Sequence, residues 1–208
     1  MSRIPIFPLE LVLFPGELLP LHIFEPRYKE MIRDCREANQ AFGVVLAEVR
    51  EEGQALAEVG CTAEVVQVVK AYDNGELDII TVGRRPCRIV EVVDEKSYYE
   101  AEVEFLDEGP APTEVPSTAL LQLFEKCYQT AFQRGVDRGA LSRAQLVSYH
   151  IAGSLPLDLG YKQKLLEMRD EQERRHSLEM NLGRWLERTE VAERARRLSG
   201  GNGHPRYN

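Results

Sequence analysis

Residues 4–28 read IPIFPLELVLFPGELLPLHIFEPRY, a stretch that is apolar, broken by prolines and poor in helical periodicity. Within it, Phe14-Pro15-Gly16-Glu17 predicts a type II turn, because proline presets φ at the first central position and glycine supplies the positive φ that the second requires. Residues 18–24 then carry five bulky apolar side chains and one histidine. Such a segment either fills a barrel or presents apolar surface to a partner.

Runs rich in valine and isoleucine follow this opening, and several of them alternate as strands do. Asn74-Gly75 separates two of the runs, which predicts a hairpin with a type I′ turn. Five or six strands at roughly ten-residue spacing favour a barrel or sandwich over a parallel sheet. The runs are 42–51, 63–72, 76–83, 87–95 and 98–108.

One helix is expected to interrupt these strands, over residues 26–37. Pro26 suits the first helical position, where its missing N–H is not needed. The apolar residues of this segment recur at helical spacing and therefore share one face. They are Tyr28, Met31, Ile32 and Cys35.

A stretch with three prolines, DEGPAPTEVPS, divides the chain and reads as a linker or long loop. Residues 1–116 hold 11 Lys and Arg against 23 Asp and Glu, whereas residues 117–208 hold 15 against 11. Two regions of opposite net charge fit two structural units that dock. The expected division is a β-rich unit at 1–108, a linker at 109–116, a helical unit at 117–198 and a flexible tail at 199–208.

The second unit reads as a set of amphipathic helices. An apolar stripe marks residues 117–134, and a short helix is expected over residues 158–168. The last helix directs Leu178, Leu182, Trp185 and Leu186 inward. The predicted N-terminal caps are Ser142 with Gln145, as a capping box, and Asp170 with Glu173.

Composition excludes several classes of protein. The net charge of −8 opposes broad attraction to nucleic acid or to an anionic membrane. No apolar run approaches the roughly 20 residues of a membrane span, and the N-terminus lacks a signal-peptide pattern. The four cysteines form no CxxC pair and are expected to be reduced and buried. We therefore expect a cytoplasmic protein without a metal site.

Motifs for catalysis are absent from the sequence. None of the 15 glycines is followed by lysine, which excludes a Walker A loop, and there is no GxGxxG. No serine lies between glycines as in a nucleophile elbow. The histidines are scattered at His22, His150, His176 and His204. The sequence thus specifies neither an enzyme nor a cofactor.

In combination, several segments make the sequence resemble the N-terminal substrate-binding domain of the Lon protease, which also occurs as a short stand-alone protein in bacteria and within cereblon. The segments are FPLELVLFPGELLPLHIFEPRY, FGVVL, EVGCTAEVVQVVKAYDNGELDIITVGRRPCRI and YYEAEVEFL, in this order. Downstream, LPLDLGYKQKLLEMRDEQERRHSLEMNL resembles the helical part of that domain.

The resemblance implies an α+β fold, in which an N-terminal PUA-like β pseudo-barrel with one inserted helix is followed by a C-terminal α-helical bundle. In Lon, ATP hydrolysis and peptide cleavage belong to later domains, so we expect neither activity here. The zinc-binding domain of cereblon has no counterpart among the cysteines of this chain.

The leading hypothesis is a non-catalytic module that binds unfolded or extended polypeptide segments, with a protease or chaperone as a further partner. An apolar groove near residues 4–28, with polar groups at its edge, would provide the site. Structural roles compete, since Leu19 and Phe24 suit a core and Glu25 can pair with Arg27 or Arg88. The candidate binding residues are Pro15, Leu19, His22, Phe24, Glu25, Arg27, Tyr28, Arg84, Arg85 and Arg88.

Two alternatives come from other functional classes. A small-molecule hydrolase or transferase would use the cleft between barrel and helices, with His22 or His150 as base, and would cluster His, Glu and Arg there. An RNA-binding role follows only from the PUA-like fold and is opposed by the acidic first unit. The ligand, the oligomeric state and regulation of a full-length Lon protease stay open.

Overall fold

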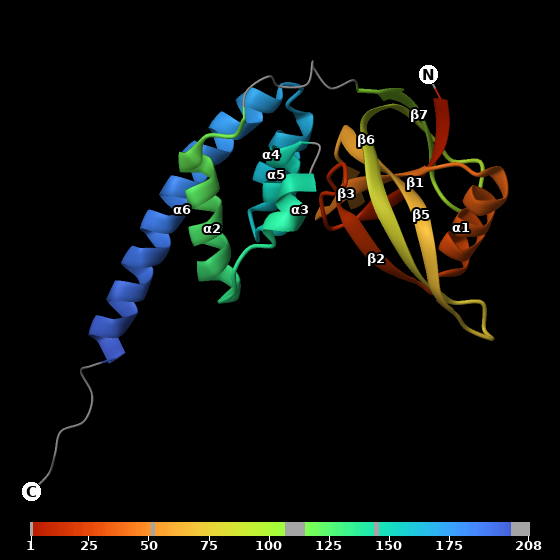
Figure 1. Cartoon of the computed structure of the whole chain (residues 1–208). Helices are drawn as coiled ribbons and strands as arrows, with labels where there is room; N and C mark the ends of the chain where they lie inside the picture. The colour runs from red at the N-terminus through yellow and green to blue at the C-terminus, as the bar shows by residue number, and fades with distance from the viewer. Residues whose placement is uncertain (1, 51–52, 107–114, 144–145, 201–208) are drawn as a thin grey trace, which may run out of the picture.

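The computed structural model describes residues 2–50, 53–106, 115–143 and 146–200. The expected linker 109–116 and the expected tail lie largely outside these residues. In the described chain, strands β1 to β7 gather at one end, and helices α2 to α6 lie beside them (Figure 1). The predicted α+β class is thus confirmed. The elements are β1 (Ser2–Leu9), β2 (Leu18–Ile23), α1 (Pro26–Ala38), β3 (Phe42–Arg50), β4 (Gly53–Leu56), β5 (Val59–Ala71), β6 (Leu77–Val93), β7 (Glu100–Phe105), α2 (Thr118–Phe132), α3 (Arg138–Arg143), α4 (Val147–Ser154), α5 (Leu159–Glu167) and α6 (Glu171–Gly200).

Five strands form a closed ring in the order β1-β7-β6-β5-β3, and a parallel pairing of β1 with β3 completes it. The other pairings are antiparallel. Closure leaves fewer free edges than an open sheet would expose. Strand β4 extends the sheet beyond β3, and β2 pairs with the first half of β6.

The expected strands 76–83 and 87–95 are wrong as separate elements, because they form the single strand β6. Its first half pairs with β2 and its second half with β7, while β5 pairs along much of its length. Gly83 lies between the two halves, where an added Cβ would come within 2.1 Å of the Phe14 carbonyl oxygen. The opening segment contributes β1 and β2, to which no element was assigned from sequence.

Both predicted turns are present, but one differs in type. Glu17 N–H donates to the Phe14 carbonyl (3.1 Å) with Gly16 at φ 82°, as a type II turn requires. In the β5–β6 hairpin the expected type I′ turn is wrong, because only the glycine of Asn74-Gly75 has positive φ. Gly75 N–H donates to the Tyr72 carbonyl (2.9 Å), so the loop has three residues and needs one left-handed position.

The pairing of β5 with β6 contains β-bulges. Register shifts leave Val66 and Val69 without opposite residues, and these side chains are 51% and 56% exposed. Strand β5 pairs with β3 only over residues 61–63. Beyond Ala63, its outer edge has no partner strand among the described residues.

The barrel and the helices share one hydrophobic core. The Phe14 ring stacks on Tyr149 of α4 with centroids 5.4 Å apart. Gln163 of α5 donates from Nε2 to the Val59 carbonyl of β5 (2.9 Å). The predicted inward face of α1 is confirmed, since its four apolar residues are buried.

A buried ion pair at the start of α6 holds α6 to α4 through Ser148. Arg174 of α6 donates to the Glu171 carboxylate (3.1 Å), and their side chains are 0% and 3% exposed. Glu171 also accepts from the backbone N–H of Ser148 in the first turn of α4 (3.1 Å) and contacts the Ser148 hydroxyl. It therefore caps α4 from a neighbouring helix.

The predicted capping box before α4 is wrong. Ser142 belongs to α3 and its hydroxyl donates to the Gly139 carbonyl (3.0 Å), while Gln145 lies outside the described residues. The cap predicted for α6 is confirmed, because Asp170 accepts from Glu173 N–H (2.9 Å). Helix α6 runs to Gly200, two residues beyond the expected end of the helical unit at residue 198.

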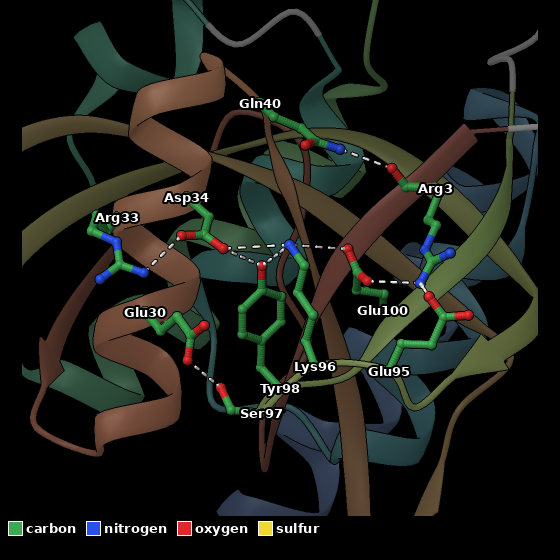
Figure 2. Close-up of polar contacts among 10 residues, drawn as sticks. All are labelled: Arg3, Glu30, Arg33, Asp34, Gln40, Glu95, Lys96, Ser97, Tyr98 and Glu100. Atoms are coloured by element: carbon green, nitrogen blue, oxygen red, sulfur yellow. Dashed lines mark hydrogen bonds and ion pairs between the residues drawn. The ribbon is translucent and has the colours of Figure 1, made fainter.

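A polar network fastens α1 to the barrel (Figure 2). Tyr98 donates to the Asp34 carboxylate of α1 (2.8 Å) and accepts from Lys96 (2.7 Å). Lys96 also lies 3.7 Å from Glu100, which accepts from Arg3 of β1 (2.9 Å). Burial raises the pKa of Tyr98 to about 12, so the phenol keeps its proton. This network is structural.

The four cysteines should be inert in the folded protein. All are buried as free thiols, and burial raises the pKa of Cys35 and Cys87 to about 12 and that of Cys127 to about 11. The thiolate is the reactive form, so we expect reaction with a disulfide reagent at pH 8 to be at least about a hundredfold slower than in guanidinium chloride. Rapid labelling of one native thiol would contradict this.

Candidate functional site

The face of β2 that points away from the core is apolar. Side chains alternate along a strand, and here Leu19, Leu21 and Ile23 turn inward. Leu18, Pro20 and His22 are exposed, and Phe24 follows at the same spacing. Leu18 is 62% exposed and Phe24 57%, large values for bulky apolar side chains.

The neighbouring strand continues this surface. Opposite Leu18 and Pro20 lie Val82 and Ile80 of β6, both partly exposed, whereas the alternating residues Ile79 and Thr81 are buried. In an antiparallel sheet with one face in water, that face normally carries polar side chains. We call the set Leu18, Pro20, Phe24, Ile80 and Val82 the outer patch.

Polar groups border the outer patch near the β5–β6 turn. His22 Nδ1 lies 2.7 Å from Asp78 Oδ1, its cross-strand neighbour, and Tyr72 donates to Asp78 Oδ2 (2.8 Å). His22 Nε2 lies 3.6 Å from Glu76 Oε2. Hydrogen bonds from His22 and Tyr72 lower the pKa of Asp78, which favours its charged form.

A groove of about 280 Å³ lies between the ends of β1 and β2. Glu25 and Arg27 form an ion pair at its rim (2.8 Å), and the Arg27 guanidinium covers the Tyr28 ring at 4.5 Å. Tyr28 is 6% exposed and serves mainly the core. This groove brings together five predicted residues: His22, Phe24, Glu25, Arg27 and Tyr28.

A larger cleft of about 710 Å³ separates the barrel from α3 and α4. Pro15, Glu17, Arg84 and His150 line it, so it gathers the residue types that the hydrolase alternative requires. Glu17, however, accepts the Phe14 N–H (3.0 Å) and so supports the type II turn, and burial raises its pKa. Burial lowers the pKa of His150.

The remaining predicted residues lie apart from the groove. Leu19 packs inward, as expected of a core residue. Arg84 pairs with Glu64 (2.7 Å) at the large cleft, and the Arg85 guanidinium covers the Phe105 ring at 4.8 Å. Arg88 lies near Glu104 (3.9 Å), so of the two pairings expected for Glu25 the one with Arg27 is present.

Sequence reasoning missed four members of the outer patch: Leu18, Pro20, Ile80 and Val82. A signal was present in LLPLHI, residues 18–23, which is apolar at odd and even positions alike. A strand apolar on both faces is covered on both or has an exposed apolar face. Phe24, for which the sequence allows either a binding role or a place in the core, is exposed.

Comparison with known proteins shows the family to which the chain belongs. Residues 3–180 match the model of the ATP-dependent protease La (LON) substrate-binding domain, and the chain is a member of that family. It is 25% identical to Lon protease 2 of Syntrophobacter fumaroxidans over 209 residues, which is 93% of this chain and 26% of the relative. A Lon protease of Dictyoglomus thermophilum is 25% identical over 202 residues, 92% and 25% respectively. The chain thus spans about a quarter of these relatives.

Solved structures share the fold. The Lon N-terminal domain protein from Xanthomonas campestris superposes with a TM-score of 0.64 at 24% identity, over 86% of this chain and 97% of that one. The N-terminal domain of the Mycobacterium avium complex Lon protease gives 0.56 at 20% identity, over 85% and 96%. Among the described residues, none of the helices has the length and apolar character to cross a membrane. The same residues contain no His, Cys, Asp and Glu group suited to a metal ion.

Proposed function

We propose that this protein is a cytoplasmic, non-catalytic module that binds exposed apolar segments of other polypeptides at the outer patch. The observation that carries the proposal is the exposure of Leu18 at the start of β2 and of Phe24 just after its end, with Val82 and Ile80 of β6 opposite Leu18 and Pro20. A contiguous exposed apolar surface with a polar border is typical of protein-binding sites. The family description, substrate-binding domain, supports the same role.

The groove and the cleft give this surface a shape that suits an extended chain. Phe24 lines the groove and Leu18 lines the cleft, so β2 runs from one hollow to the other. A strand rises about 3.3 Å per residue, so about six residues of extended chain would span from Leu18 to Phe24. Contact with both hollows would favour an extended segment over a single side chain.

Substitution of the outer patch tests this function. Leu18→Ser and Phe24→Ser, singly and together, should fold because both side chains are exposed. Each change removes apolar contact area, so the double variant should bind a labelled, permanently unfolded protein at least about tenfold more weakly. The measurement is the Kd by fluorescence anisotropy.

Met180→Ser is the matched control, since Met180 is 50% exposed on α6, outside the patch. It should leave the Kd unchanged. Equal Kd values for the double variant and the wild-type protein would exclude the outer patch as the site. Assays for ATP hydrolysis and peptide cleavage should give no activity, and activity abolished by a point substitution would contradict the non-catalytic role.

A further inference from the structure

The charged border of the outer patch is asymmetric. At the β2 end marked by Leu18, Arg84 and Glu64 neutralise each other at 2.7 Å. At the other end, Asp78 and Glu76 are partly exposed, with side-chain values of 35% and 27%. Within the described chain, their only ion-pair contact is the His22 imidazole.

Nearby cations have contacts of their own, although Lys70 also attracts the Asp78 carboxylate. Arg27 pairs with Glu25 (2.8 Å). Lys29 donates to the Asn74 carbonyl (3.1 Å), and the Lys70 ammonium lies over the Tyr72 ring at 4.1 Å. Residues 1–116 carry 11 Lys and Arg against 23 Asp and Glu, so the whole unit around this border is acidic.

We infer that the outer patch selects apolar segments flanked by a lysine or arginine, which Asp78 and Glu76 receive beside His22. This inference rests on the proposed function and names its ligand class. Within the span of about six residues from Leu18 to Phe24, the apolar part of β2 before His22 covers residues 18–21, so the apolar run beside the acidic border has about four residues. Charge complementarity at the rim of an apolar site sets specificity more than total affinity.

Peptides that differ in one charge test the inference. Each carries the same four-residue apolar run and a single flanking position filled by lysine, serine or glutamate, on either side of the run. Of the two lysine peptides, the one that binds the wild-type protein more tightly should have about fivefold higher affinity than the matching serine peptide. The matching glutamate peptide should bind most weakly. The preference should shrink at about 0.5 M salt, where the border charges are screened.

Variants locate the preference. Glu76→Gln and Asp78→Asn keep the size of each side chain and should bring the lysine and serine peptides to nearly equal affinity, while Glu76→Lys should favour the glutamate peptide. Glu91→Gln removes a carboxylate from the far half of the same strand, β6, and should leave the preference unchanged.

The outcomes separate this inference from the proposed function. If all peptides bind with equal affinity and the Leu18 and Phe24 double variant loses that binding, the preference for a flanking cation is overturned and the proposed binding function is kept. Absence of binding to every peptide and to the unfolded protein would overturn both. Concentration-dependent dimerisation abolished by the same double variant would assign the outer patch to a second copy of the chain, which also overturns the inference.

Discussion

Replacing Glu171 with alanine should lower the free energy of unfolding by about 3–5 kcal/mol, one of the largest effects that we expect in this protein. The side chain is 3% exposed and holds the fully buried Arg174. Without Glu171, the Arg174 charge stays in the core without this carboxylate, and the Ser148 N–H of α4 loses its acceptor. Urea unfolding followed by circular dichroism measures the loss.

Arg175→Ala provides the comparison for Glu171→Ala. Arg175 bonds the same carboxylate (2.8 Å), but its side chain is 12% exposed, so its removal should cost clearly less. Glu171→Gln keeps the size and the acceptor oxygen and should recover part of the stability. A Glu171→Ala protein within about 1 kcal/mol of wild type would contradict the role of Glu171 in neutralising Arg174 and in joining α4 to α6 through Ser148.

Substituting Gly83 with alanine should destabilise the protein by about 3 kcal/mol, through overpacking rather than loss of contacts. The added Cβ would lie 2.1 Å from the Phe14 carbonyl oxygen and 2.9 Å from its carbonyl carbon. These are backbone atoms of the segment that leads into the type II turn, so relief requires that β6 and this turn move apart. The midpoint of urea unfolding should fall accordingly.

Gly135→Ala is the matched control for Gly83→Ala. Nothing lies within 4 Å of an added Cβ at Gly135, and its φ is not positive, so this change should be neutral or slightly stabilising. Because Gly83 lies beside Leu18 and Arg84 at the large cleft, Gly83→Ala should also weaken binding at the outer patch. Equal stability of the two alanine variants would refute the close approach of β6 to Phe14.

Local features of the fold were accessible from sequence because each depends on a few adjacent residues. The buried face of α1 follows from apolar spacing, and the two turns follow from Pro15-Gly16 and Asn74-Gly75. The barrel followed from the number and spacing of strands together with the family resemblance. The predicted type I′ turn at Asn74-Gly75 is wrong because the loop length depends on how β5 and β6 pair.

Features that depend on distant residues were missed. Residues 84–86, Arg-Arg-Pro, read as a break, yet β6 continues through them because β5 and then β7 supply partners. The cap of α4 comes from Glu171, 23 residues away from Ser148, which no local pattern reveals.

The candidate site was predicted in part, for the same reason. Phe24, Glu25 and Arg27 were accessible because they lie in one unusual segment, and they do meet at one groove. Ile80 and Val82 join the outer patch only through cross-strand register with β2. Arg85 and Arg88 follow Arg84 closely in sequence, but their strand carries them toward β7.

The bulges at Val66 and Val69 bear on colloidal behaviour. A regular unpaired edge is a template on which further chains add as strands, and aggregates grow from such edges. Two interruptions within a few residues prevent the β5 edge from offering an unbroken row of hydrogen-bonding groups. If the outer patch binds unfolded chains as we propose, the β5 edge would not seed aggregation of the bound chains.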